Sequence, residues 1–147
     1  MQRGYVKQCK SPVDLLPSDI LNLANFFGMK PLKIISTFCK LVNIDDYFER
    51  IRDMGIKIPE LSNNLKIYAI QIKARRYCIF YKGENCVLPL AARPKRCMAK
   101  TEQELRAYEA EKHAFYLELA EYILNAGDVE RGIELYFQCQ ASDSKKP

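Results

Sequence analysis

Between two helix-rich regions of the chain lies the segment Tyr77-Cys78-Ile79-Phe80-Tyr81-Lys82-Gly83-Glu84-Asn85-Cys86-Val87-Leu88. Its first five residues include aromatic and β-branched side chains, which favour strands. The polar residues 82–85 are typical of a turn, and the chain then returns antiparallel until Pro89 ends the second strand. We therefore expect one antiparallel hairpin here, with Cys78 and Cys86 close together across it.

Helical periodicity dominates the chain before this hairpin. Ser18 is a preferred N-cap residue and Gly28 a preferred terminator, so a helix is predicted between them. A short third helix is expected over residues 44–53, and a strand over residues 65–72, where apolar residues nearly alternate. The second helix begins at Pro31 and is supported by apolar residues at helical spacing, namely Leu32, Ile35, Phe38, Cys39 and Val42.

Two further helices follow the hairpin. Thr101 and Glu104 form a capping box that begins a long helix, which Gly127 ends. Asp128 then caps a last helix that runs to about Cys139. These elements predict a mainly α protein with a small antiparallel β-hairpin, an α+β fold in which helices flank the cysteine-bearing hairpin. The expected core contains seven apolar residues: Leu23, Phe27, Ile35, Phe38, Leu105, Phe115 and Leu119.

The length of 147 residues favours one domain. We expect it to span residues 1–140, with a helical extension over 101–140 and a frayed polar tail over 141–147. A composition of 48% hydrophobic and 28% charged residues excludes a broadly disordered chain. No apolar run approaches about 18 residues, and the N-terminus lacks a secretory signal. The sequence therefore predicts a cytoplasmic protein without a membrane span.

Charge is strongly partitioned along the chain, although the formal net charge is only +5. Residues 66–100 contain nine basic residues against Glu84 alone, whereas residues 101–140 contain nine acidic residues against three basic ones. The basic band over 66–100 is either neutralised by the acidic helix or presented to a polyanion such as nucleic acid. We favour neutralisation, because no groove-reading motif accompanies the band, and expect the acidic helix to lie near it.

The six cysteines divide into two groups by their surroundings. Cys39 and Cys139 occur within apolar helical patterns, so they are expected to be small buried side chains. Cys78, Cys86 and Cys97 are close in the sequence, and the hairpin with its following loop can bring their thiols together. Because cytoplasmic thiols stay reduced, this second group is available to bind a metal ion such as Zn²⁺.

Several stretches of the chain resemble the YkgJ-type cysteine-cluster family, a family of zinc- or iron-chelating domains. One is the opening Cys9-Lys10-Ser11-Pro12-Val13-Asp14-Leu15, and another is the helix entry over residues 16–24. The most specific part is the series Cys78-Ile79-Phe80-Tyr81, then Cys86, then Arg93-Pro94-Lys95-Arg96-Cys97. The resemblance extends over about residues 5–100.

The chain departs from the family pattern in its N-terminal motif. The family opens with a CxxCxxCC run, of which only Cys9 is present here, while Gln2, Tyr5 and Gln8 occupy the other positions. The gap that follows Cys86 is also one residue longer than in the family. The resemblance therefore implies four metal ligands, which suffice for one tetrahedral site. They are Cys9, Cys78, Cys86 and Cys97.

The expected function is zinc or iron binding by one four-cysteine site with a structural role. A closed four-thiolate site favours Zn²⁺, and iron, alone or in an iron–sulfur cluster, is the alternative. Two other functions stay open: an iron–sulfur or metal-dependent redox protein, and a nucleic-acid-binding module that uses the basic band over 66–100. The six glycines form no phosphate-binding loop, and His113 is the only histidine. We therefore expect no catalytic residues.

Overall fold

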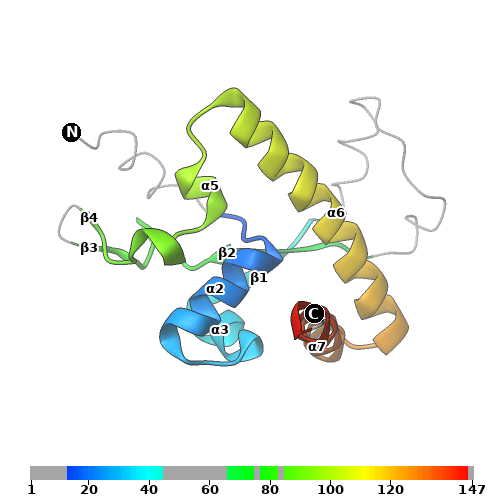
Figure 1. The fold of residues 1–147 in the computed structure, drawn as a ribbon. Helices are drawn as coiled ribbons and strands as arrows, with labels where there is room; N and C mark the ends of the chain where they lie inside the picture. The colour runs from blue at the N-terminus through cyan, green and yellow to red at the C-terminus, as the bar shows by residue number, and fades with distance from the viewer. Residues whose placement is uncertain (1–12, 45–65, 75–76, 83–84, 146–147) are drawn as a thin grey trace. The chain divides into compact units, whose positions relative to one another are not determined.

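The computed structural model describes residues 13–44, 66–74, 77–82 and 85–145 of the chain (Figure 1). Within these residues the protein is mainly helical, with small two-stranded antiparallel sheets, which confirms the predicted fold class. The elements, labelled as in Figure 1, are α2 (Pro17–Phe27), α3 (Pro31–Phe38), β1 (Cys39–Asn43), β2 (Tyr68–Ile72), β3 (Tyr81–Lys82), β4 (Asn85–Cys86), the 3-10 helix η2 (Leu90–Ala92), α5 (Lys95–Met98), α6 (Glu102–Ala126) and α7 (Val129–Lys145).

The chain forms two compact units. Unit 1 contains residues 1–41 and 70–115, and unit 2 contains residues 42–69 and 116–147. The third expected helix lies outside the described residues except at Ile44, which is in neither a helix nor a strand. The single domain expected from the sequence stays a prediction. Of the four candidate ligands of the metal site, Cys78, Cys86 and Cys97 belong to unit 1.

Helix α2 is capped by a carboxylate in place of the expected serine hydroxyl. The helix begins at Pro17, and the N–H of the N-cap residue Leu16 donates to Asp19 Oδ2 at 2.9 Å. The Ser18 hydroxyl is buried and makes no hydrogen bond within the described residues. The N-cap predicted at Ser18 is therefore wrong, whereas the helix end predicted at Gly28, with a φ of 64°, is confirmed.

The second expected helix ends earlier than its apolar spacing indicated. Helix α3 stops at Phe38, and Cys39 begins strand β1, so the helix predicted through Val42 is wrong beyond Phe38. Pairing with β2 explains the change, because the Lys73 N–H donates to the Phe38 carbonyl at 2.8 Å. Long-range backbone hydrogen bonds have here overridden a local helical pattern.

Strand β2 confirms the strand expected over residues 65–72, although it covers only Tyr68–Ile72. In unit 1 its other edge is also hydrogen-bonded: the Leu15 N–H donates to the Ile70 carbonyl at 2.8 Å. The Ile72 N–H in turn donates to the Val13 carbonyl at 3.1 Å. Within this strand Ile70 and Ile72 are fully buried.

The predicted hairpin is present but short. Strands β3 and β4 pair antiparallel, with Tyr81 opposite Cys86. Cys78 lies before the hairpin, in an isolated bridge with Ala74, and its carbonyl accepts the Tyr81 N–H at 2.9 Å. That bond closes a turn where a strand was expected. The prediction that Cys78 faces Cys86 across the ladder is therefore wrong.

The predicted core residues are all at least partly buried. In unit 1 the rings of Phe27 and Phe38 stack with centroids 4.7 Å apart, and Phe38 lies 5.3 Å from Phe80. This aromatic cluster joins α2, α3 and the turn before β3. Four of the seven predicted residues are buried and three are half-buried: buried are Leu23, Ile35, Phe115 and Leu119, and half-buried are Phe27, Phe38 and Leu105.

The boundaries of α6 and α7 agree with the sequence, except that α7 is longer. The Glu104 N–H donates to Thr101 Oγ1 at 3.0 Å, and the Thr101 N–H donates to Glu104 Oε1 at 3.2 Å, which confirms the capping box. Helix α6 ends before Gly127, whose φ is 71°. Helix α7 runs to Lys145, past the predicted end at Cys139.

In unit 2, α6 and α7 meet at Gly132. A Cβ atom at this position would lie 2.5 Å from Ile123 Cα and 2.8 Å from Ile123 N, so only glycine fits without a backbone shift. Close to this crossing the rings of Tyr122 and Tyr136 meet edge to face with centroids 5.5 Å apart. The crossing of the two helices thus forms an apolar core in unit 2.

Candidate metal centre

Three of the four predicted ligands lie in the described part of unit 1, each on a different local structure. Cys78 is buried in the turn that precedes β3. Cys86 is half-buried at the end of β4, and Cys97 is half-buried in the one-turn helix α5. Cys9 lies outside the described residues. Two thiols are therefore partly accessible, and one is enclosed by the core.

The side chain of Arg93 holds the segment between Cys86 and α5 in a closed loop. Its Nε donates to the Leu88 carbonyl at 2.9 Å, and its Nη2 reaches the Cys86 carbonyl at 3.5 Å. In the sequence Arg93 stands out only as part of the family-like stretch that ends at Cys97. In the structure it also organises the backbone that carries Cys86.

The carboxylate of Asp19 holds α5 against α2. It is only 1% exposed, and while Oδ2 caps α2, Oδ1 accepts the Lys95 N–H at 3.0 Å. One buried side chain thus bonds the first turns of two helices, of which the second carries Cys97. Burial raises the pKa of Asp19, and its bonds to the Leu16 and Lys95 amides oppose that rise. The sequence gives no signal for this role, because Asp19 is one of several acidic residues and its partner Lys95 is far away in the chain.

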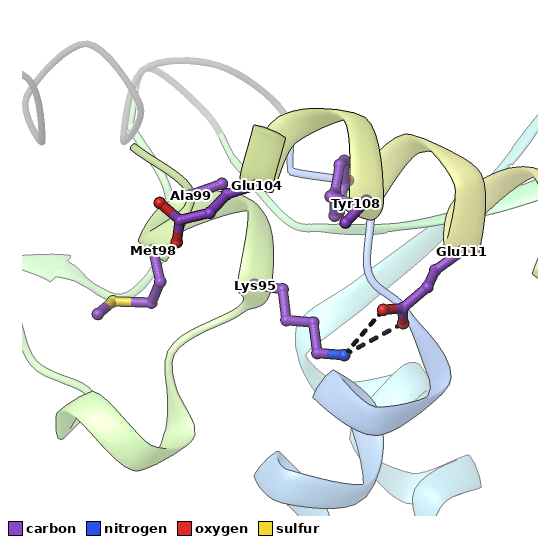
Figure 2. Close-up of a pocket in the computed structure, with 7 residues that line it drawn as sticks. Lys95, Met98, Ala99, Glu104, Tyr108 and Glu111 are labelled. Carbon is purple, nitrogen blue, oxygen red and sulfur yellow. Dashed lines mark hydrogen bonds and ion pairs between the residues drawn. The ribbon is translucent and has the colours of Figure 1, made fainter. Parts of the chain in front are cut away.

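The basic band and the acidic helix meet at α5. Lys95 Nζ lies 3.1 Å from Glu111 Oε2 and 3.2 Å from Glu111 Oε1, and Figure 2 shows the lysine side chain directed at this carboxylate. Both side chains are about half exposed, so the pair contributes little to stability. It nevertheless confirms that part of the acidic helix lies near the basic band.

A small cavity of about 230 Å³ lies beside this ion pair (Figure 2). Its charged groups are satisfied by neighbours, since Lys95 binds Glu111, and Glu104 accepts the Thr101 hydroxyl at 3.0 Å. The cavity therefore presents apolar side chains to a ligand, but few polar groups that are available to bind one. Its lining consists of Lys95, Met98, Ala99, Glu104, Ala107, Tyr108 and Glu111.

A thiol that the sequence analysis excluded from the site lies close to Cys78. Cys39 is buried, as predicted, with 4% exposure, but it begins a strand. Burial raises the pKa of Cys39 to about 12, the Lys73 ammonium opposes this rise, and the neighbouring Cys78 adds to it. The sequence carries no local signal for this proximity, because it depends on the pairing of β1 with β2.

The remaining cysteine is not where the sequence placed it. Cys139 is exposed on α7, so the prediction of a buried side chain is wrong. Leu135 is half-buried and Tyr136 is buried, whereas Cys139 lies on the exposed side of the helix. Within the described ranges, no group of three or more His, Cys, Asp or Glu side chains is placed to hold a metal ion; a group that includes Cys9 falls outside them.

No family model matches the chain, and neither a curated protein nor a solved structure is detectably similar to it. The resemblance to the YkgJ-type family therefore stays a prediction that rests on the motif residues. Among the described helices, none is long and apolar enough to cross a lipid bilayer.

Proposed function

We propose that this chain is a non-catalytic, cytoplasmic metal-binding protein with one four-thiolate site. The proposed ligands are Cys78, Cys86 and Cys97, with Cys9 as the fourth ligand that the family resemblance implies. Zn²⁺ is the preferred ion, because a closed site of four thiolates is its usual structural environment. Iron, alone or in an iron–sulfur cluster, is the alternative for the same donor set.

The observation that carries the proposal is the polar framework around Cys86 and Cys97. Arg93 bonds to the carbonyls of the β4 segment, and Asp19 bonds to the first amide of α5. Ligands of a metal site need such outer contacts, which fix their orientation. A short segment with two half-buried thiols, anchored by Asp19 of α2 and by its own Arg93, is well suited to this role.

The donor chemistry supports a soft metal over a hard one. Thiolates bind Zn²⁺ and iron well, whereas Mg²⁺ and Ca²⁺ prefer oxygen ligands. A Zn²⁺ ion with four thiolates would cross-link the N-terminal segment to the region of the hairpin. Asp19 and Arg93 then keep Cys97 and Cys86 in place, and the partial exposure of these two thiols gives the ion a path of entry.

The charge distribution is compatible with this site. Four thiolates on Zn²⁺ leave a net charge of −2, which favours nearby cations. Lys73 lies near Cys39 and Cys78, and its Nζ donates to the Thr37 carbonyl at 3.2 Å. Lys95 contributes less, since its charge is already paired with Glu111.

The proposal is tested by removing one half-exposed ligand. We expect Cys86→Ser to lose the metal and to unfold at a lower temperature than the parent chain, because structural zinc binding is coupled to folding. The matched control is Cys139→Ser, which changes an exposed cysteine of unit 2 and should keep both the metal and the melting temperature. Chelator competition and thermal unfolding, with and without added Zn²⁺, measure both effects. Full metal retention in Cys86→Ser would contradict the proposal.

Nucleic-acid binding by residues 66–100 is the less favoured function. Part of the band is engaged within the protein: Lys95 binds Glu111, and Arg93 binds backbone carbonyls. A band that served phosphates would give an affinity for generic DNA or RNA that falls steeply with salt. Absence of binding at low salt would exclude this function.

A further inference from the structure

A second small cavity lies within unit 2, at the corner where α6 turns into α7. Its lining combines the two residues Lys66 and Tyr68, at the start of β2, with residues from the end of α6 and the start of α7. The volume of the cavity is about 260 Å³. Pockets for drug-sized ligands begin at about 300 Å³, so this cavity suits a smaller molecule.

The wall of this cavity is largely aliphatic. Ile123 of α6 is buried, and Val129, the first residue of α7, is half-buried. Leu124 also lines the cavity but is 50% exposed, so a large apolar side chain is in contact with water there. At Gly127 a Cβ atom would meet nothing within 4 Å, so the corner leaves space beside these side chains. An apolar group that covers Leu124 would remove this surface from water, which is favourable.

Two opposite charges line the same cavity without binding each other. Within the part of the chain that the structure describes, Lys66 forms no ion pair. Asp128 caps α7 through Oδ2, which accepts the Arg131 N–H at 2.8 Å, while its Oδ1 accepts no hydrogen bond from the same described residues. In the cavity of unit 1, by contrast, Lys95 and Glu111 bind each other. A lysine and a carboxylate that stay apart in one cavity can each bind an opposite charge of a ligand.

We infer that the cavity of unit 2 binds a free α-amino acid with a branched aliphatic side chain, such as leucine. The carboxylate of the ligand would face Lys66, its ammonium group would face Asp128 Oδ1, and its side chain would lie against Ile123, Leu124 and Val129. A simple carboxylic acid would leave Asp128 without a cation, and a simple amine would leave Lys66 without an anion. The site goes beyond the proposed metal binding, since the described candidate metal ligands belong to unit 1.

A series of matched ligands tests this inference on the full chain. Leucine, 4-methylpentanoate and 3-methylbutylamine share one apolar group, but the second lacks the ammonium group and the third lacks the carboxylate. Titrations are followed by the chemical shifts of backbone amides in NMR spectra. We expect millimolar leucine to shift the amides of residues 66–68 and 123–129, and to bind about fivefold more tightly than either analogue, because each analogue loses one exposed charge contact. Equal binding of 4-methylpentanoate and leucine, or no shifts at these residues with leucine, would overturn the inference.

Two variants identify the groups that bind the two charges. Lys66→Met keeps the aliphatic stem, and Asp128→Asn keeps a preferred N-cap residue, so both should fold like the parent chain. We expect each to weaken leucine binding about fivefold. Lys66→Met should leave the affinity for 3-methylbutylamine unchanged, whereas Asp128→Asn should not weaken the binding of 4-methylpentanoate.

The matched control is Lys82→Met, which changes an exposed lysine of unit 1 outside the cavity lining and should keep the parent affinity for leucine. Melting temperatures of all three variants show whether each is folded. Leucine binding at the parent affinity in both Lys66→Met and Asp128→Asn would overturn the assignment of this site.

Discussion

The segment over residues 86–97 in unit 1 and the α6–α7 crossing in unit 2 are stabilised in different ways. The first buries Leu88 and Ala92 and is also anchored by two polar side chains: Asp19 accepts the Lys95 N–H from far away in the chain, and Arg93 donates to the Leu88 carbonyl within the segment. The second depends on apolar burial and on the close contact at Gly132. The polar anchors of the first region hold backbone next to Cys86 and Cys97 in place, whereas the helix pair mainly adds stability.

The largest effect should follow from removing the carboxylate that anchors the polar region. Asp19→Ala leaves the Leu16 and Lys95 amides without their acceptor, and each unsatisfied buried donor costs about 1–3 kcal/mol. We expect a loss of about 3 kcal/mol in the free energy of unfolding, measured by urea denaturation. Asn22→Ala, on the exposed side of the same helix, should change it by less than about 0.5 kcal/mol. Equal effects of both variants would contradict the role of Asp19.

The apolar region is tested at its closest contact. Gly132→Ala places a methyl group 2.5 Å from the Ile123 backbone, so the two helices must separate. Overpacking of this kind typically costs about 1–3 kcal/mol, and we expect a loss near about 2 kcal/mol in thermal or urea unfolding. The control is Gly127→Ala, where a Cβ meets nothing within 4 Å and only the positive φ opposes the change. Its cost should be about 1 kcal/mol. A larger loss at Gly127 than at Gly132 would refute the close crossing.

A smaller effect is expected at the start of α6. Thr101→Ala removes the hydroxyl that accepts the Glu104 N–H, and the loss of such an N-cap costs about 1 kcal/mol. The unfolding free energy of Gln103→Ala, an exposed neighbour without a capping bond, should stay close to that of the parent. If Thr101→Ala is as stable as Gln103→Ala, the capping box contributes nothing to stability.

The smallest expected effects are changes of stability with pH, and the contributions of Asp19 and Glu104 should change in opposite directions. The pKa of Asp19 is raised by burial, so its contribution to stability is present below the ordinary pKa of 3.8 and is lost as pH rises through the folded-state pKa. The pKa of Glu104 is lowered, chiefly by its hydrogen bond with Thr101, so its contribution is present above the ordinary pKa of 4.5 and is lost as pH falls through the folded-state pKa.

Unfolding curves at several acidic pH values compare the parent with Asp19→Asn and Glu104→Gln. Lowering the pH should increase the stability of the parent relative to Asp19→Asn and decrease it relative to Glu104→Gln. The same slope for both comparisons would contradict the assigned pKa directions.

The sequence predicted features that depend on neighbouring residues. The capping box of Thr101 and Glu104, the helix ends at Gly28 and Gly127, and the mainly α fold class are all confirmed. In each case the physical cause lies within a few residues of the chain. Hydrophobic periodicity also identified four buried core residues, because burial on one side of a helix follows its repeat.

Features that depend on distant partners were not predictable in this way. Cys39 had helical spacing, yet it begins a strand because β2 supplies hydrogen bonds from more than thirty residues away. Asp19 caps α2 through a local bond to the Leu16 amide, but its second bond, to the amide of Lys95, joins residues far apart in the chain. Cys78 lies in a turn and beside Ala74, although its β-forming neighbours suggested a strand.

The central claim is most directly tested by the metal content and visible spectrum of the full chain after anaerobic purification. A thiolate site held by the polar region predicts about one zinc per chain and a colourless solution, since Zn²⁺ has a filled d shell. A chain that contains no metal, and that takes up neither zinc nor iron when either is supplied under reducing conditions, would contradict the account.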